Sequence, residues 1–231
     1  MGHYLKALLL FIPAIALFGF AVSNEGRAVK DFSLLNTNGK TVGLKDYPDA
    51  KGFIIVFTCN HCPFAKLYPQ RLNKLNSKYQ PLGVPLIAIS STDTLLYEED
   101  TYPMMVAKSK NENFNFPYLF DEFQKVAKDF KAQKTPHAFV IWKENDKWVI
   151  KYNGAIDDNG AEPDHVTKPY VADAVDQLLA GKEIAVKETK SIGCQVILRK
   201  YYQLLNGAWP GVQEECYNEE RLNYSAFLRH N

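Results

Sequence analysis

Two cysteines with a histidine between them are the part of this sequence best suited to chemistry. Cys59 and Cys62 are separated by Asn60 and His61, and Pro63 follows. Two intervening residues allow the sulfurs to close a small disulfide ring. Cys59 can therefore attack a disulfide, and Cys62 can resolve the mixed disulfide that results. The pattern predicts a redox dithiol.

The neighbouring residues predict that this pair lies where a strand passes into a helix. Residues 52–58 are an apolar, β-branched run typical of a buried central strand. Residues 64–79 carry apolar side chains at three- and four-residue spacing, which predicts a helix that Pro69 bends. We expect Cys62 in the first helical turn, where free amides and the helix dipole lower the pKa of a thiol. His61 is expected to tune the couple by making the disulfide more oxidising.

Further along the chain the pattern alternates between strands and helices. The expected elements are a hairpin within residues 29–47 that turns at Asn38-Gly39, strands at 84–90, 138–142 and 148–152, and helices at 121–131 and 170–181. Their order predicts an α/β protein with a central mixed β-sheet flanked by helices on both faces. The first crossover is expected to be parallel and the last strand pair antiparallel. Residues 91–120 and the tail after Gly181 are expected outside this core.

Other uses of the cysteines stay open. A zinc or copper site would need further ligands, which Cys194, Cys216, His137 or His165 could supply. The sequence has no second closely spaced cysteine pair, which argues against structural zinc. Two inert core thiols are the simplest alternative, but such a pair rarely stays unreacted in an oxidising compartment. Covalent haem attachment is excluded because Pro63 stands where a histidine is needed.

Six motifs, taken in order, resemble those of the peroxiredoxin-like branch of the redoxin (alkyl hydroperoxide reductase and thiol-specific antioxidant) family. That family belongs to the thioredoxin superfamily. The motifs lie within residues 29–200 and read FTCNHCPF, FNFPYLFDEFQKVAKDF, KTPHAFVIW, YNGAIDD, LLAGK and SIGC. The resemblance implies a thioredoxin-like fold with an N-terminal hairpin and a C-terminal extension. It also implies a thiol–disulfide oxidoreductase that needs neither a metal nor an organic cofactor.

The resemblance assigns substrate docking to Thr135 and Pro136. The two residues correspond to the proline loop of thioredoxin folds, where a cis peptide bond places backbone beside the dithiol. The Thr135 backbone would pair with a substrate strand, and Pro136 would shield the thiolates from metals. Lys134 and His137 stand where many relatives carry a cysteine and an aspartate, so a third active-site thiol is not expected. His137 is expected either to tune the dithiol or to face solvent.

Two alternative functions remain beside disulfide exchange. Peroxiredoxins carry a threonine three residues before the attacking cysteine, but Val56 occupies that place before Cys59, which disfavours an antioxidant peroxidase. A copper-binding or redox-sensing protein would use the dithiol together with His61 or His137 as ligands.

Cys194 and Cys216 remain after the dithiol is assigned. In an oxidising compartment we expect them to form a structural disulfide that pins the tail. The SIGC motif raises a second possibility, in which Cys194 is a lone thiol near the core.

Charged residues give fewer functional indications. A formal net charge of +1 over 231 residues, without a long basic run, argues against nucleic acid as a partner. The chain contains no acid within the strand at 52–58 that could be assigned to proton transfer. The other acids near predicted strand ends are expected to be solvated surface charges; they are Asp93, Glu98, Glu99, Asp157 and Asp158.

The first 23 residues are predicted to be an export signal. Lys6 precedes an apolar run at 7–22, and the small residues Ala21 and Ser23 suit a signal peptidase. An uncleaved membrane anchor is the alternative. The expected organisation is a signal peptide at 1–23, a thioredoxin-like domain at 24–200 and an extension at 201–231. The expected location is periplasmic or otherwise extracytoplasmic, and the expected partners are protein thiols or disulfides and a redox partner protein.

Overall fold

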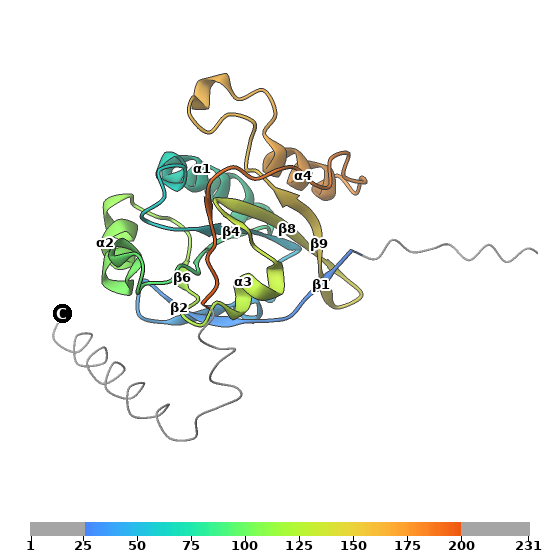
Figure 1. Cartoon of the computed structure of the whole chain (residues 1–231). Helices are drawn as coiled ribbons and strands as arrows, with labels where there is room; N and C mark the ends of the chain where they lie inside the picture. Colours follow the sequence, from blue (N-terminus) through green and yellow to red (C-terminus); the bar gives the residue numbers. More distant parts are fainter. Residues whose placement is uncertain (1–25, 200–231) are drawn as a thin grey trace, which may run out of the picture.

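A computed structural model describes residues 26–199, and a mixed β-sheet runs through this part of the chain (Figure 1). Its strands are β1 (Ala28–Val29), β2 (Ser33–Asn36), β3 (Thr41–Gly43), β4 (Gly52–Thr58), β5 (Leu86–Ser90), β6 (Tyr118–Phe120), β8 (His137–Glu144) and β9 (Lys147–Gly154). They follow the order β1-β9-β8-β4-β5-β6-β2-β3. A separate pair consists of β7 (Lys134–Thr135) and β10 (Cys194–Gln195).

Four α-helices of the described chain cover the sheet. They are α1 (Pro69–Tyr79), α2 (Tyr102–Asn111), α3 (Lys125–Phe130) and α4 (Tyr170–Leu179). Residues of α1 and α4 pack into one hydrophobic cluster, and residues of α3 pack into another. Figure 1 shows α1 and α4 on one side of the sheet and α3 on the other. The prediction of a mixed sheet with helices on both faces is confirmed.

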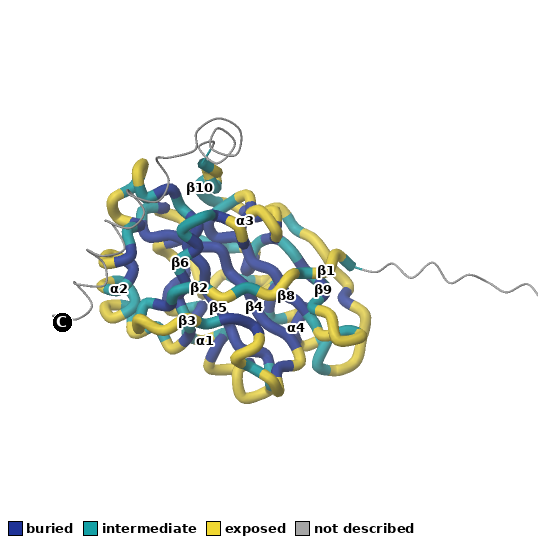
Figure 2. The backbone as a smooth tube through the Cα atoms, turned by 90° about the horizontal axis from the view of Figure 1, so that it is seen from below, coloured by how far each residue is buried: buried dark blue, intermediate teal, exposed yellow. Residues whose placement is uncertain are grey.

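β4 lies in the middle of the sheet, between β8 and β5, and all seven of its residues are therefore buried. Successive side chains of a strand point to opposite faces. Accordingly, Ile54 and Val56 join the cluster under α1 and α4, and Phe53 and Phe57 join the cluster under α3. β4 is parallel to β5, and β8 is antiparallel to β9, as the sequence predicted. β4 also pairs antiparallel with β8. Figure 2 shows the buried backbone concentrated along these central strands.

The predicted N-terminal hairpin is also confirmed. β2 and β3 are antiparallel, and Gly39 adopts a φ of 81° in the turn between them. Such a backbone conformation favours glycine. β2 also pairs with β6, so the hairpin extends one edge of the main sheet.

The helix after the dithiol begins later than the sequence predicted. Residues 65–67 form a 3₁₀ turn, and α1 starts at Pro69. The prediction that Pro69 bends a helix is wrong, because proline occupies the first helical position, where no backbone donor is needed. Cys62 consequently lies ahead of the 3₁₀ turn and not inside α1. Its carbonyl still accepts a hydrogen bond from the Lys66 amide at 3.1 Å.

The helix predicted at 121–131 is shorter in the structure. α3 begins only at Lys125, because Gln124 adopts a left-handed conformation with a φ of 55°. The buried Asp121 carboxylate nevertheless accepts a hydrogen bond from the Ala127 amide at 2.9 Å. Burial raises the pKa of Asp121.

Residues 91–120 belong to the core, so the expectation that they lie outside it is wrong. They supply α2 and also β6, which pairs with β5 on one side and β2 on the other. Tyr118 and Leu119 of β6 are fully buried. The strand is only three residues long, which is too short for a periodic pattern to reveal.

The tail after α4 returns to the sheet instead of leaving it. In Figure 1 the orange-to-red segment crosses the molecule from α4 and ends beside α3. The predicted signal at 1–23, the extension at 201–231 and Cys216 lie outside the described residues. Within residues 26–199, none of the helices is long and apolar enough to cross a membrane.

Candidate active site

The end of β4 holds both cysteines of the predicted dithiol. Cys59 follows directly on Thr58, and Cys62 comes three residues later. Both residues are fully buried, both carry free thiols, and they pack together with Ala65. The sequence therefore placed the pair at the correct strand end, but these sulfurs are covered and not open to solvent.

The Thr135-Pro136 loop lies directly against the two sulfurs. Its peptide bond is cis, as the resemblance implied. Cys59 Sγ lies within hydrogen-bonding distance of Thr135 Oγ1, at 3.1 Å, and Cys62 Sγ lies 3.1 Å from the Thr135 carbonyl oxygen. The structure thus brings together the residues predicted for chemistry and those predicted for docking.

A third cysteine completes this cluster. β10 pairs antiparallel with β7, which places Cys194 opposite Thr135. The Cys194 amide donates a hydrogen bond to Cys62 Sγ at 3.3 Å. Cys194 is itself a free thiol, half-buried beside the dithiol. Its predicted disulfide with Cys216 remains a prediction, because Cys216 is outside the described residues.

The three thiols differ strongly in acidity. The pKa of Cys62 is lowered to about 4, first because the Cys59 thiol donates a hydrogen bond to its sulfur. The thiol and the amide of Cys194 and the amide of Ala65 stabilise the Cys62 thiolate further. The same hydrogen bond to Cys62, together with burial, raises the pKa of Cys59. Burial and the neighbouring Cys62 raise the pKa of Cys194 to about 11. The pKa of Cys62 is thus the lowest of the three thiols, whereas the sequence suggested that Cys59 would be the more acidic one.

His61 faces a buried carboxylate that sequence analysis missed. Its ring Nδ1 contacts Asp100 Oδ2, its backbone amide donates to Asp100 Oδ1 at 3.2 Å, and the Asn60 amide donates to the same oxygen. The ring also stacks on Tyr97, with 3.7 Å between centroids and 4° between planes. Asp100 therefore fixes the turn that carries the cysteines. Three consecutive acids, Glu98 to Asp100, gave no signal that the last of them is buried.

Two further residues behind Cys59 were also missed. Lys108 of α2 donates a hydrogen bond to the Cys59 carbonyl at 3.3 Å, and burial lowers the pKa of its ammonium group. The buried Tyr118 hydroxyl donates to Asn60 Oδ1 at 3.0 Å. Both residues come from the segment at 91–120, where sequence periodicity was weak.

Two acids that were expected on the surface are buried. Asp157 accepts hydrogen bonds from Arg71 at 2.9 Å and from the Tyr68 hydroxyl at 3.1 Å. Asp93 pairs with Arg199 at 2.5 Å. The expectation of solvated charge is wrong for these two because each has an arginine partner from a distant part of the chain. Glu98, Glu99 and Asp158 are exposed, as expected.

The histidines considered as additional metal ligands do not join the dithiol. Among the described residues, a single group has three ligand atoms of the right kind close together: Cys59, His61 and Asp100, all within 4.8 Å of one another. His137 instead accepts a hydrogen bond from the Gln133 amide at 3.2 Å, and burial lowers its pKa to about 4. His165 pairs with Glu162 at an exposed position.

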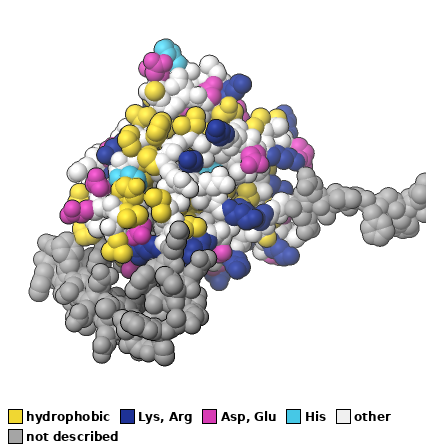
Figure 3. All heavy atoms as spheres, in the orientation of Figure 1, with side chains coloured by type: hydrophobic (Ala, Val, Ile, Leu, Met, Phe, Trp, Pro, Cys, Tyr) yellow, Lys and Arg dark blue, Asp and Glu magenta, His cyan; other side chains and the backbone are white. Residues whose placement is uncertain are grey.

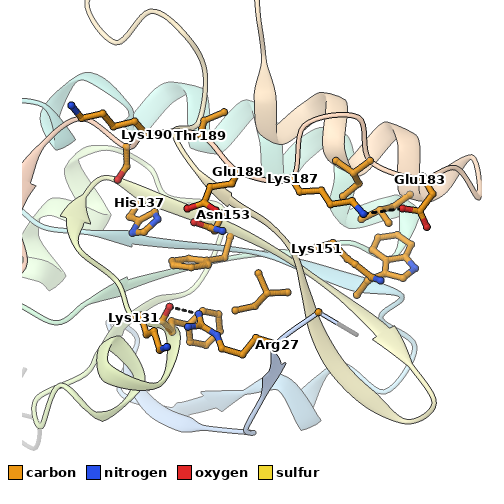
Figure 4. A pocket seen from close by; sticks show the side chains of 18 of the residues that line it. Arg27, Lys131, His137, Lys151, Asn153, Glu183, Lys187, Glu188, Thr189 and Lys190 are labelled. Atoms are coloured by element: carbon orange, nitrogen blue, oxygen red, sulfur yellow. Dashed lines mark hydrogen bonds and ion pairs between the residues drawn. The ribbon is translucent and has the colours of Figure 1, made fainter. Parts of the chain in front are cut away.

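A cavity of about 1050 Å³ lies on the other side of the proline loop. Figure 4 shows His137, Asn153 and Glu188 along its wall, with Arg27 and Lys131 opposite them. None of the three cysteines lines it. His137 therefore faces this cavity, neither in the dithiol cluster nor free in solvent.

Two curated proteins with a similar sequence are thiol-disulfide oxidoreductases. Thiol-disulfide oxidoreductase ResA from Bacillus thuringiensis is 27% identical over 120 residues, which are 52% of this chain and 64% of the relative. The chain therefore spans less than two thirds of the length of that curated relative.

Solved structures agree over more of the chain. An uncharacterised conserved protein from Geobacillus kaustophilus is 34% identical, with a TM-score of 0.69, and the match covers 76% of this chain and 93% of that one. A putative thiol:disulfide interchange protein DsbE from Chlorobium tepidum has a TM-score of 0.50 at 17% identity, covering 68% and 96%, which supports the fold alone. The fold is thioredoxin-like. The model of the AhpC/TSA family matches residues 26–158, more than half of the sequence, and the chain belongs to that family.

Proposed function

We propose that this protein is a thiol–disulfide oxidoreductase that works through Cys59 and Cys62. The observation that carries the proposal is the pair of free thiols that both contact Thr135, beside the cis Thr135-Pro136 bond. When the protein reduces a substrate, the S–S bond of the substrate breaks, and a bond between Cys59 and Cys62 forms. Two electrons pass to the substrate, whose sulfurs leave as thiols. The reverse reaction oxidises a substrate dithiol.

Cys59 is the attacking sulfur in this proposal, and Cys62 resolves the mixed disulfide. The contact of the Cys59 sulfur with Thr135 Oγ1, on the residue proposed to dock the substrate, supports this order. Because the pKa of Cys59 is raised, its proton must leave as the attack begins. The two groups titrate as a coupled pair. His61 acts on the pair indirectly, because its ring is held by Asp100 and Tyr97.

The proposed substrates are cysteine-containing proteins. Exposed apolar side chains flank the site in the sequence: Phe64 and Leu67 follow Cys62, Leu96 precedes Tyr97, and Ile192 precedes Cys194. Figure 3 shows apolar side chains gathered on the face between α1 and α2. A polypeptide strand would dock on the Thr135 backbone, which β10 occupies at present. Docking therefore exchanges one strand for another.

Export is part of the proposal and rests on the sequence. The apolar run at 7–22 followed by small residues is typical of an export signal. A periplasmic or other extracytoplasmic location would let the dithiol cycle with protein disulfides. Fractionation of cells that produce the full chain, with mass spectrometry of the mature N-terminus, tests this. A start at Asn24 outside the cytoplasm is expected, and an intact N-terminus in the membrane would support the anchor instead.

The central test is disulfide exchange with a protein substrate. The full chain is expected to accelerate the reduction of insulin by dithiothreitol, and Cys59→Ser and Cys62→Ser are each expected to abolish the acceleration. Cys62→Ser should accumulate a mixed disulfide between Cys59 and the substrate, because the resolving sulfur is gone. Cys216→Ser is the matched control for loss of a cysteine. An unchanged rate in Cys59→Ser contradicts the proposal.

The same preparations distinguish the alternatives. Rapid consumption of hydrogen peroxide that requires Cys59, without insulin reduction, would favour an antioxidant peroxidase. Tight copper binding that is lost in both dithiol variants, again without exchange, would favour a copper-binding or sensing protein.

A further inference from the structure

The chain places one of its own strands on the edge of the proline loop. We call residues 191–199 the C-terminal strap. Within it, Cys194 pairs with Thr135, and Gln195 pairs with Lys134. A Cβ atom on Gly193 would lie only 2.0 Å from the Thr135 carbonyl oxygen, so the approach is closer than any side chain permits. The strap thus lies where the proposed function requires a substrate strand to dock.

Hydrogen bonds beyond β10 hold the strap in place. The Val196 amide donates to the Gln133 carbonyl at 2.9 Å, and Gln124 Nε2 donates to the Ile197 carbonyl at 2.9 Å. Arg199 closes the strap with an ion pair to Asp93. These contacts hold Cys194 opposite Thr135 and beside the dithiol, so its position does not depend on a single interaction.

Cys62 contacts both of the other thiols. The Cys194 amide donates a hydrogen bond to Cys62 Sγ at 3.3 Å, and the Cys194 side chain packs against the cluster that Cys59 and Cys62 form. Because a disulfide requires the Cβ atoms of its two cysteines to lie close together, cysteines packed in this way need only a small side-chain movement to form one. We propose that Cys194 is a third redox cysteine, which takes over the disulfide from the dithiol by attacking Cys62. This inference rests on the proposed function of the same site.

The exchange is balanced within the protein. After a substrate has been reduced, the Cys59–Cys62 disulfide is present and Cys194 is a thiol. Loss of its proton lets Cys194 Sγ attack Cys62 Sγ; the Cys62–Cys194 bond forms, and the bond to Cys59 breaks. Cys59 leaves as a thiolate and takes up a proton, as the environment that raises its pKa in the dithiol favours. No net oxidation or reduction occurs.

The transfer would move the disulfide toward the surface. Cys59 and Cys62 are fully buried, whereas Cys194 is only half-buried and follows the exposed Ile192. A dithiol reductant could then attack Cys194 and regenerate the three thiols, releasing Cys62 as the more acidic and therefore better leaving group. The strap would act in this way as the route between the buried dithiol and a redox partner.

Disulfide mapping tests the proposal directly. The full chain with Cys216→Ser, and the same protein with Cys59→Ser added, are equilibrated in a glutathione redox buffer, quenched with acid, alkylated and digested without reduction. In the Cys59→Ser protein a peptide pair linked through Cys62 and Cys194 is expected to be the main oxidised product. Further substitution of Cys194→Ser should eliminate it. A glutathione adduct on Cys62, with Cys194 alkylated in full, would overturn the proposal.

Two strap variants test whether position matters. Gly193→Ala is expected to displace β10 and cause a several-fold loss of the Cys62–Cys194 product, although all sulfurs remain. Ile197→Ala is the matched control, since that side chain of the strap is exposed, and its yield should equal that of the parent. Circular dichroism shows whether each variant is folded. If Gly193→Ala does not fold, Arg199→Ala serves in its place. Equal yields in the folded strap variants and the parent would contradict a positioned strap.

Failure of this inference is distinguishable from failure of the proposed function. If insulin reduction requires Cys59 and Cys62 but no Cys62–Cys194 product forms, only the third cysteine is refuted. If insulin reduction does not change in Cys59→Ser, the proposed function is refuted, whatever the mapping gives.

Discussion

Residues 52–62 and residues 91–111 build the same site in different ways. The first segment is a buried strand followed at once by the cysteines, so neighbours in the sequence are neighbours in space. The second segment contributes Asp100, Lys108 and the ring of Tyr97, which reach the dithiol turn from 36 to 49 residues away in the sequence. The strap at 191–199 is still more distant in sequence. The two cysteines are thus positioned by the strand directly before them, whereas the residues that surround them are positioned by contacts between distant parts of the chain.

The largest expected effect is a change in the pH at which the Cys62 thiol ionises. Its pKa of about 4 lies below the ordinary value of 9.0, so it stabilises the reduced fold above pH 9, and this contribution is lost as the pH falls through about 4. Cys59, whose pKa is raised, opposes folding only above pH 9. Thiolate absorbance near 240 nm should therefore rise near pH 4 in the parent. In Cys59→Ala, which removes the donated hydrogen bond, the rise should move toward pH 9; a rise that stays near pH 4 would assign the acidity to the backbone amides instead.

Shortening a buried side chain of β4 is expected to lower the stability of the fold more than the substitutions that follow. Phe57 is fully buried in β4, and its ring lies 5.4 Å from that of Phe130 and 5.7 Å from that of Phe139. Phe57→Ala should lower the free energy of unfolding by about 3–5 kcal/mol, as large-to-small changes in cores do. Urea denaturation measures this value. Leu95→Ala, at a side chain that is 83% exposed, is the control and should change it little.

Loss of the buried carboxylate should affect both stability and redox behaviour. Asp100→Ala leaves the amides of Asn60 and His61 without their acceptor, which we expect to cost about 3 kcal/mol. The turn that carries the cysteines should loosen, and the reduction potential should shift with it. Glu98→Ala in the same turn is the control, because that side chain is exposed. Equal stabilities of the two variants would show that Asp100 does not hold the turn.

Loosening of the strap should have the smallest effect on stability. Arg199→Ala breaks the ion pair with the buried Asp93, and we expect a loss of about 2 kcal/mol, because the carboxylate loses a charge-assisted hydrogen bond. The rate at which iodoacetamide alkylates Cys194 should nevertheless rise, since the strap would open more often. Lys45→Ala, which removes an exposed pair with Asp31, is the matched control and should leave that rate unchanged.

Sequence patterns predicted the regular elements well where burial was continuous. The apolar run of β4, the hairpin turn at Asn38-Gly39 and the amphipathic α4 were all found as expected. Pro69 was misjudged because the same residue that interrupts a helix also suits its first position. The three-residue β6 gave too little periodicity to detect.

The sequence by itself predicted the pair of cysteines and their position at the end of a central strand, because both depend on residue types at short spacing, and the family resemblance added the proline loop. Only the tertiary structure decided which carboxylate is buried beside His61, which thiol has the lowest pKa, and that Cys194 lies against Cys62. The physical reason is that a hydrogen bond or a burial depends on the partner that the fold brings close. Patterns of neighbouring residues do not encode that partner when it lies 40 or 130 positions away.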